Sequence, residues 1–223
     1  MWTGEYERPL IRFLQTHDVA GWTCFDVGAN VGAVALALAK YVGANGKVYA
    51  CEPGPPNLQR LRGNFGLNPS LLPETEILEC GVADKPCELW WAEDPGNPGN
   101  ALLENSGSHK IPVTTLDLIV AKRQIDHVDF IKIDVEGMEY PVLCGAAETL
   151  RRFHPPVYLE TLSRYVNSAH GVTFGEIQKL LVGEFGYRLY RLSSSGRVIP
   201  LLGYRHGGYT LAIHPERPVL SRT

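Results

Sequence analysis

The chain has 223 residues, of which 44% are hydrophobic and 20% charged, enough to bury one sizeable α/β core. Its 21 basic and 24 acidic residues give a formal net charge of −3, which argues against the broad cationic surface that binds nucleic acids or anionic membranes. The first residues do not show the basic segment followed by an apolar stretch that is typical of a signal peptide. No apolar run approaches the length of about 18 residues that a membrane-spanning helix needs. We expect a cytoplasmic protein without nucleic-acid or membrane partners, whose five cysteines, lacking a CxxC pair, are reduced core residues.

Strand-like and helix-like runs alternate along most of the chain, which is the pattern of a parallel sheet with helices on both faces. The expected strands are 22–27, 47–51, 76–81, 128–135 and 157–160. The expected helices are 31–41, a run from 55, 114–122, 138–153 and a run from 173 that ends at 186. We expect a single α/β domain spanning residues 1–223.

Three segments depart from this alternation. Residues 1–20 form an expected helical extension at the amino terminus, and residues 187–214 an expected antiparallel meander at one edge of the sheet. Residues 86–112 begin with a short strand and continue as a Gly-, Asn-, Pro- and Ser-rich loop. Because that loop exceeds the usual connection length, we expect an insertion on the substrate side, with Trp91 either contacting the acceptor or packing in the sheet.

A glycine-containing loop follows the first expected strand. Asp26, Gly28, Asn30 and Gly32 lie at a strand-to-helix turn, where backbone N–H groups and a helix amino terminus face a ligand. A dinucleotide site needs glycine in place of Asn30, because the pyrophosphate approaches that backbone closely. A cofactor without a pyrophosphate and with an amino-acid tail, such as S-adenosylmethionine, tolerates Asn30. The alternative is a tight turn required only for packing.

Two later strand ends supply further candidates for the cofactor site. Glu52 ends the second strand 24 residues beyond Gly28, where a carboxylate can accept hydrogen bonds from both ribose hydroxyls. Val82 and Asp84 follow the third strand, where backbone groups or the Asp84 carboxylate can meet an adenine edge. Each also has a structural interpretation, as a solvated carboxylate or a common turn.

Residues 129–139 carry the most informative pattern. Lys132, Asp134 and Glu136 alternate with apolar residues, so one face of a buried strand is ionisable. A buried lysine needs a partner, and Asp26 or Asp134 can supply it, so we interpret Lys132 as part of a structural ion pair. Asp134 and Glu136 lie where the strand delivers side chains to the ligand crevice, which makes them functional candidates.

Four motifs occur in order along the chain: 26–32, Glu52-Pro53, 113–117, and 131–139 followed by 142–145. Together they resemble the FkbM family of S-adenosylmethionine-dependent methyltransferases. The resemblance implies a class I methyltransferase fold, a Rossmann-like three-layer α/β sandwich whose mostly parallel, seven-stranded sheet has an antiparallel last strand. It also implies S-adenosylmethionine as cofactor and O-methylation of a hydroxyl on a sugar, polyketide or other natural product.

Methyl transfer to a neutral hydroxyl requires removal of its proton. Asp134, Glu136 and Glu160 are the catalytic candidates, with Asp134 or Glu160 as general base at adjacent strand ends. Asp134 is also a candidate cofactor ligand. The same carboxylates can instead hold Mg²⁺, which would lower the pKa of the acceptor hydroxyl. We favour the metal-free base, because no histidine lies near these strand ends.

Two other functions remain open at this point. An NAD(P)-dependent oxidoreductase can use a related doubly wound sheet, but Asn30 and the antiparallel ending argue against it. A non-catalytic cofactor-binding scaffold is the second alternative, and the carboxylates at Asp134, Glu136 and Glu160 argue against that. The acceptor and the oligomeric state are not encoded in any motif that we identify.

Overall fold

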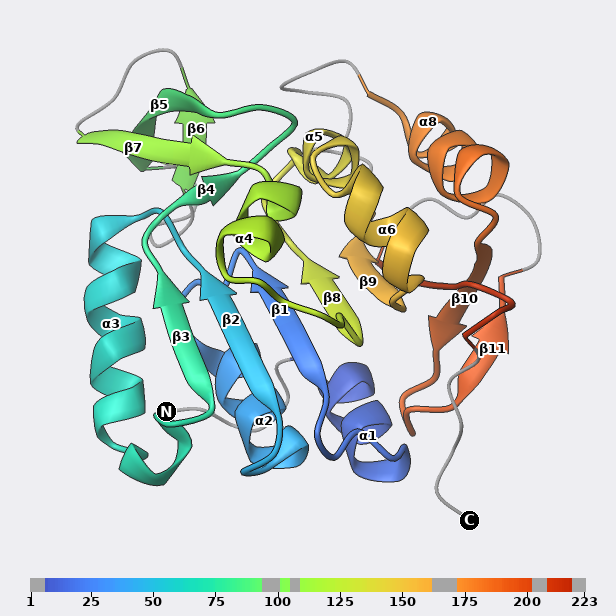
Figure 1. The fold of residues 1–223 in the computed structure, drawn as a ribbon, viewed down its shortest axis with the longest axis horizontal. Helices are drawn as coiled ribbons and strands as arrows, with labels where there is room; N and C mark the ends of the chain where they lie inside the picture. Colours follow the sequence, from blue (N-terminus) through green and yellow to red (C-terminus); the bar gives the residue numbers. More distant parts are fainter. Residues whose placement is uncertain (1–6, 94–100, 105–108, 162–171, 202–207, 218–223) are drawn as a thin grey trace.

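A computed structural model describes residues 7–93, 101–104, 109–161, 172–201 and 208–217. Its main sheet has eight strands in the order β11-β10-β12-β9-β8-β1-β2-β3, with helices on both faces (Figure 1). A second, four-stranded sheet lies beyond the carboxyl ends of β1, β2 and β3, at the top of Figure 1. This three-layer architecture is the one expected from the sequence.

The strands of the main sheet are β1 (Thr23–Val27), β2 (Lys47–Cys51), β3 (Thr75–Leu78), β8 (Phe130–Ile133), β9 (Val157–Glu160), β10 (Arg188–Leu192), β11 (Val198–Pro200) and β12 (Tyr209–Ile213). The second sheet contains β4 (Gly81–Val82), β5 (Cys87–Glu93), β6 (Ala101–Glu104) and β7 (His109–Thr114). The helices are α1 (Arg8–Thr16), α2 (Ala33–Val42), α3 (Pro55–Gly66), α4 (Leu116–Lys122), α5 (Glu139–Cys144), α6 (Ala147–Phe153) and α8 (Phe174–Gln178), together with the short 3-10 helix η1 (Pro69–Leu71) and the π-helix η2 (Lys179–Glu184).

Local sequence explains where several helices begin. Helix α3 begins at Pro55, since proline is tolerated in a first turn where no N–H bond is needed. Helix α4 begins after Thr115, whose hydroxyl accepts a hydrogen bond from the N–H of Leu118 at 3.1 Å. Helix α8 begins with the predicted capping box of Thr173 and Glu176.

Two hydrophobic cores, one on each face, hold the helices to the sheet. The first packs α1, α2 and α3 on one face, with Phe13, Leu38 and Phe65 fully buried. The second packs α4, α5, α6 and α8 on the other face, with Leu116 and Leu150 fully buried. Because both faces are covered, the central strands are mainly apolar.

The carboxyl-terminal strands differ from the expected meander. Strand β12 pairs antiparallel with both β9 and β10, so it lies inside the sheet, and β11 pairs with β10 at the edge. The antiparallel last strand is therefore present, with β11 as an eighth strand beyond the seven expected. The insertion of β12 places its first residue, Tyr209, opposite Glu160 at the site.

The segment expected to be a loop contains a sheet. Strand β5 pairs antiparallel with β6 and β7, and β4 pairs with β7. The prediction of one strand over 76–81 was also wrong, because the chain leaves the main sheet after β3 and Gly81 enters the second sheet as β4. Both the second sheet and the end of β3 depend on pairing between strands that are distant in the sequence, which the Gly- and Pro-rich composition does not reveal.

The single helix expected over 138–153 is two helices, α5 and α6. They separate at Gly145, where an added Cβ would lie 1.9 Å from the carbonyl oxygen of Ala83, so only glycine permits this approach to the second sheet. The carboxylate of Asp117 then caps α6, accepting hydrogen bonds from the N–H groups of Glu148 and Thr149 at 3.0 and 2.8 Å.

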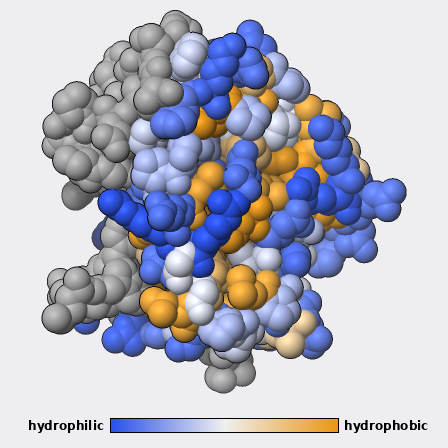
Figure 2. Space-filling view, turned by 90° about the vertical axis from the view of Figure 1, so that its left-hand side faces the viewer, coloured by the Kyte–Doolittle hydropathy of each residue, from blue (hydrophilic) through white to orange (hydrophobic). Residues whose placement is uncertain are grey.

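The surface around α3 is mainly hydrophilic, with apolar residues in separate patches (Figure 2). The exposed large apolar side chains of the described residues include Leu67 and Leu72, which are 81% and 43% exposed near η1. Among the residues that the structure describes, no helix has both the length and the apolar character needed to span a bilayer.

Candidate active site

The loop between β1 and α2 is held tightly against the neighbouring strand ends. Gly28 and Gly32 have φ angles of 79° and 85°, and Asn30 between them has a φ of 50°. The N–H groups of Gly28 and Ala29 both donate to the carbonyl oxygen of Cys51, at 3.0 and 2.9 Å. These bonds place the loop at the carboxyl ends of β1 and β2, as the sequence predicts.

Glu52 is the partner of this loop. Its carboxylate is 5% exposed and accepts hydrogen bonds from the N–H groups of Asn30 and Gly54, both at 2.8 Å. The side-chain amide of Asn57 donates to the same carboxylate at 3.4 Å. Burial raises the pKa of Glu52, and these donors oppose that rise. The structure thus brings Asn30 and Glu52 together, as expected for two parts of one ligand site.

A buried cation lies beneath the loop. Lys132 Nζ lies 3.1 Å from Asp26 Oδ1 and 3.5 Å from Asp134 Oδ2, and it donates to the carbonyl oxygen of Gly28 at 2.9 Å. Asp26 has no exposed surface, and burial raises its pKa against the opposing charge of Lys132. Asp26 therefore faces Lys132 below the loop, which is the pairing expected from the sequence, and a role of Asp26 in cofactor binding stays a prediction.

Three carboxylates gather where β8 and β9 end. Ligand atoms of Asp134, Glu136 and Glu160 all lie within 4.8 Å of one another, so the structure unites the three catalytic candidates. Burial, reinforced by the charges of Asp134 and Glu136, raises the pKa of Glu160 to about 9, so Glu160 carries a proton at neutral pH.

The raised pKa of Glu160 makes the stability of the fold depend on pH. The pKa of Glu160 is about 9 in the folded chain and 4.5 ordinarily, so its contribution is fully present below pH 4.5 and is lost as the pH rises to about 9. We expect Glu160→Gln to remove this loss and to raise the Tm at pH 8.5 by about 2 °C or more. Thermal melts from pH 5 to 9 would check this. The control is Glu88→Gln, because the Glu88 side chain on β5 is exposed. An unchanged pH profile in Glu160→Gln would contradict the assignment.

The turn after β8 is fixed from below by Glu139. Its carboxylate is 2% exposed and accepts hydrogen bonds from the N–H groups of Val135 and Gly137, both at 3.2 Å. Glu136 has a φ of 54°, a left-handed conformation that is uncommon outside glycine. The buried carboxylate therefore holds a strained turn that directs Glu136 toward Asp134 and Glu160.

Polar side chains that no sequence motif predicts lie behind Asp134. The hydroxyl of Tyr209 donates to Asp134 Oδ2 at 3.2 Å, and the ring of Tyr209 stacks on that of Tyr158 at 4.9 Å. The hydroxyl of Tyr158 donates to Glu7 Oε2 at 3.2 Å. Burial raises the pKa of Glu7 and of both tyrosines. No local signal reveals these contacts, since they depend on β12 lying beside β9.

The adenine-side candidates lie in the second sheet. Val82 is 3% exposed and packs in a hydrophobic core, so only its backbone can face a ligand. Asp84 follows β4 and is exposed. Trp91, expected to be either a lid or a packing residue, is 4% exposed, and its ring lies against Gly54. The packing interpretation holds for Trp91.

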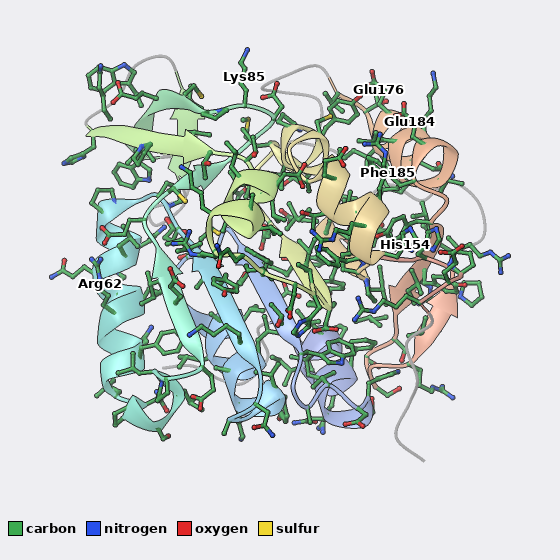
Figure 3. All side chains as sticks on the ribbon, viewed as in Figure 1. Arg62, Lys85, His154, Glu176, Glu184 and Phe185 are labelled. Carbon is green, nitrogen blue, oxygen red and sulfur yellow. The ribbon has the colours of Figure 1, made fainter. Side chains whose placement is uncertain are left out.

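A histidine pair lies away from this site, at the opposite end of β9 and β12. His154 follows α6 (Figure 3), and its Nδ1 lies 3.2 Å from Glu216 Oε2. The rings of His154 and His214 stack at 3.8 Å with an angle of 12° between them. Because each imidazole lone pair lies in its ring plane, these nearly parallel rings do not converge on one metal ion. The pair instead attaches the turn after β12 to α6.

Comparison with known proteins identifies the family. The chain matches the model of the methyltransferase FkbM domain over residues 26–189. It is 26% identical to the hexuronic acid methyltransferase AglP of Haloferax volcanii, covering 65% of this chain and 58% of that protein. It is 28% identical to the methyltransferase sdnD of Sordaria araneosa, covering 55% of this chain and 60% of that protein. The chain thus spans about three fifths of the length of these curated relatives.

Solved structures share the fold. A methyltransferase FkbM from Methylobacillus flagellatus matches with a TM-score of 0.57 and 17% identity, over 87% of this chain and 44% of that one. An O-methyltransferase from Bacillus cereus in complex with SAH matches with a TM-score of 0.55 and 14% identity, over 95% of this chain and 80% of that one. The expected class I methyltransferase architecture is therefore confirmed. Since the family model extends from β1 into β10, the chain belongs to the FkbM methyltransferase family.

Proposed function

We propose that this methyltransferase transfers a methyl group from S-adenosylmethionine to an oxygen atom of a sugar or another small molecule. The observation that carries the proposal is the placement of the Asn30–Glu52 loop and the three-carboxylate cluster at the same edge of the sheet. A ligand held by the loop is thereby adjacent to candidate bases. The hexuronic acid methyltransferase among its relatives supports a sugar-type acceptor.

The cofactor site that we propose comprises Gly28, Asn30, Gly32, Glu52 and Asp134, with the backbone of Val82 and the side chain of Asp84 on the adenine side. Glu52 accepts the ribose hydroxyls, for which its carboxylate must stay ionised. The loop N–H groups and the Asn30 amide face the amino-acid tail. When bound, S-adenosylmethionine supplies an electrophilic methyl group on its sulfonium.

The carboxylates provide the acid–base chemistry. A carboxylate at this edge of the sheet could accept the proton of an acceptor hydroxyl, which would make that oxygen a better nucleophile toward the methyl group that the cofactor would supply. The methyl–sulfur bond would break as the oxygen–carbon bond forms, with S-adenosylhomocysteine as the leaving group. We assign Asp134 as this base, because Glu160 already holds a proton at neutral pH. Glu160 and Glu136 then orient the acceptor hydroxyl through hydrogen bonds.

The same donor set is chemically suited to Mg²⁺, which prefers carboxylate oxygens. The metal-free base remains our proposal, since the Glu160 proton already relieves repulsion within the cluster. Turnover that survives EDTA treatment would support it. Turnover that disappears with EDTA and returns with Mg²⁺ would establish the metal-dependent route instead.

Cofactor identity can be tested by calorimetry with S-adenosylhomocysteine and with NADH. We expect binding of the first and none of the second; the reverse result would favour an oxidoreductase. A labelled-methyl screen of cell extracts would then identify the acceptor class. Binding without methyl incorporation into any fraction would favour a non-catalytic scaffold.

Glu52→Gln provides a site-specific test of cofactor binding. The amide cannot accept hydrogen bonds from Asn30, Gly54 and the ribose with both of its terminal atoms, so the loop loses an acceptor. We expect the Kd for S-adenosylhomocysteine to rise by about tenfold or more. Glu79→Gln, an exposed carboxylate paired with Arg62, is the control and should retain the wild-type Kd. Equal affinity in Glu52→Gln would exclude ribose recognition by Glu52.

A further inference from the structure

Lys132 occupies an unusual place for a lysine. It lies in β8, between β1 and β9 in the centre of the main sheet, and is 2% exposed. Its Nζ donates a hydrogen bond to Gly28 O at 2.9 Å and forms ion pairs with Asp26 Oδ1 at 3.1 Å and Asp134 Oδ2 at 3.5 Å.

Stability alone does not account for this cation. Burying a lysine and a carboxylate costs several kcal/mol of desolvation per ion, and replacing such a pair with apolar residues is often neutral or stabilising. A purely structural pair would also need only Asp26, whose carboxylate is fully buried. Lys132 also contacts Gly28 and Asp134, which belong to the proposed active site.

The backbone N–H and carbonyl of Gly28 are both hydrogen-bonded to neighbouring strands. Its N–H donates to Cys51 on β2, and its carbonyl accepts from Lys132 on β8. Asp134 is likewise held by Lys132 on one side and by the hydroxyl of Tyr209 on the other. One ammonium therefore connects the first residue of the cofactor loop to the carboxylate assigned as the base.

We infer that Lys132 is a positioning residue that fixes the carbonyl of Gly28 and the carboxylate of Asp134 relative to each other, so that cofactor and base are aligned by one cation. This inference rests on the proposed function. It differs from the structural ion pair expected from the sequence, because its consequence is measured in cofactor binding and turnover rather than in folding.

The experiment separates a structural from a positioning role of Lys132 by removing the charges of Asp26 and Lys132 together. Asp26→Asn alone keeps Lys132 and its contacts to Gly28 and Asp134. Asp26→Asn with Lys132→Met removes the cation without leaving a charged Asp26 unpaired, so the fold is not burdened by an isolated buried charge. The Tm and the Kd for S-adenosylhomocysteine are measured for wild type and both variants, and kcat and KM once an acceptor is known.

A positioning role predicts that the double variant matches the Tm of Asp26→Asn within a few degrees but binds S-adenosylhomocysteine about tenfold or more weakly, with a lower kcat. Equal Kd and kcat in the two variants would overturn the inference and leave Lys132 as a structural residue. Wild type that binds no S-adenosylhomocysteine would overturn the proposed cofactor as well, so the two failures are distinguishable.

Lys132→Arg decides the question if the double variant does not fold. A guanidinium keeps the positive charge beside Asp26 but has a planar donor geometry that differs from that of an ammonium. An unchanged Tm with about tenfold weaker cofactor binding would support positioning. An unchanged Kd would show that the site does not depend on the geometry of Lys132.

Discussion

Asp134→Asn is expected to lower the rate of methyl transfer by about 10²- to 10⁴-fold, the usual contribution of a general base. Asparagine has nearly the same shape but cannot accept the acceptor's proton. Asp134 also pairs with Lys132 and Tyr209, so the variant disturbs the network that orients the base. Initial rates with labelled S-adenosylmethionine and the identified acceptor measure the effect.

Asp126→Asn is the matched control for this substitution. Its carboxylate is exposed and pairs with His127, remote from the strand ends that form the site. We expect wild-type turnover and melting temperature for Asp126→Asn. Wild-type turnover in Asp134→Asn would assign the base to another group, with Glu160 at high pH the first to examine because its pKa is about 9.

Gly28→Ala is expected to give the largest loss of stability among simple substitutions in the loop. A Cβ at residue 28 would lie 1.8 Å from the carbonyl oxygen of Asp134, and the φ of 79° is itself unfavourable for alanine. Overpacking and backbone strain together amount to about 2–4 kcal/mol. We expect the Tm to fall by about 5–15 °C and S-adenosylhomocysteine binding to be lost.

Gly63→Ala tests whether the effect belongs to the loop rather than to glycine replacement in general. Gly63 lies in α3, and an added Cβ would meet nothing within 4 Å. Alanine favours helix by up to about 1 kcal/mol, so we expect an unchanged or slightly raised Tm. A Gly28→Ala variant with wild-type melting and binding would contradict the close approach of the loop to β8.

The loop and the acidic strand end were predictable because their signals are local. A buried strand, a glycine at the turn and a small-residue helix occur within residues 23–42, and a carboxylate ends the next strand. Parallel strands align their carboxyl ends, so these residues meet without further information. The alternation around Lys132 likewise indicated an ionisable face before its partners were known.

The reason for Gly28 was less accessible. The sequence left open whether the loop glycines serve a ligand or a tight turn, and the structure shows that Gly28 allows the backbone of Asp134 to approach closely. Asp26 pairs with Lys132, as the need of a buried lysine for a partner had indicated. In both cases a residue within a recognised motif serves the packing of neighbouring strands, and the identity of the neighbour depends on strand order.

The sequence by itself determined the alternation of strands and helices, the glycine-containing loop after β1 and the acidic ends of β8 and β9, because periodicity, turn residues and strand-end position are properties of short segments. Only the tertiary structure decided the second sheet, the position of β12 between β9 and β10, and the contacts of Tyr209 with Asp134 and of Tyr158 with Glu7. These features join residues that are far apart in the chain. They depend on which strands pair and on which polar groups become buried, and no single segment specifies either.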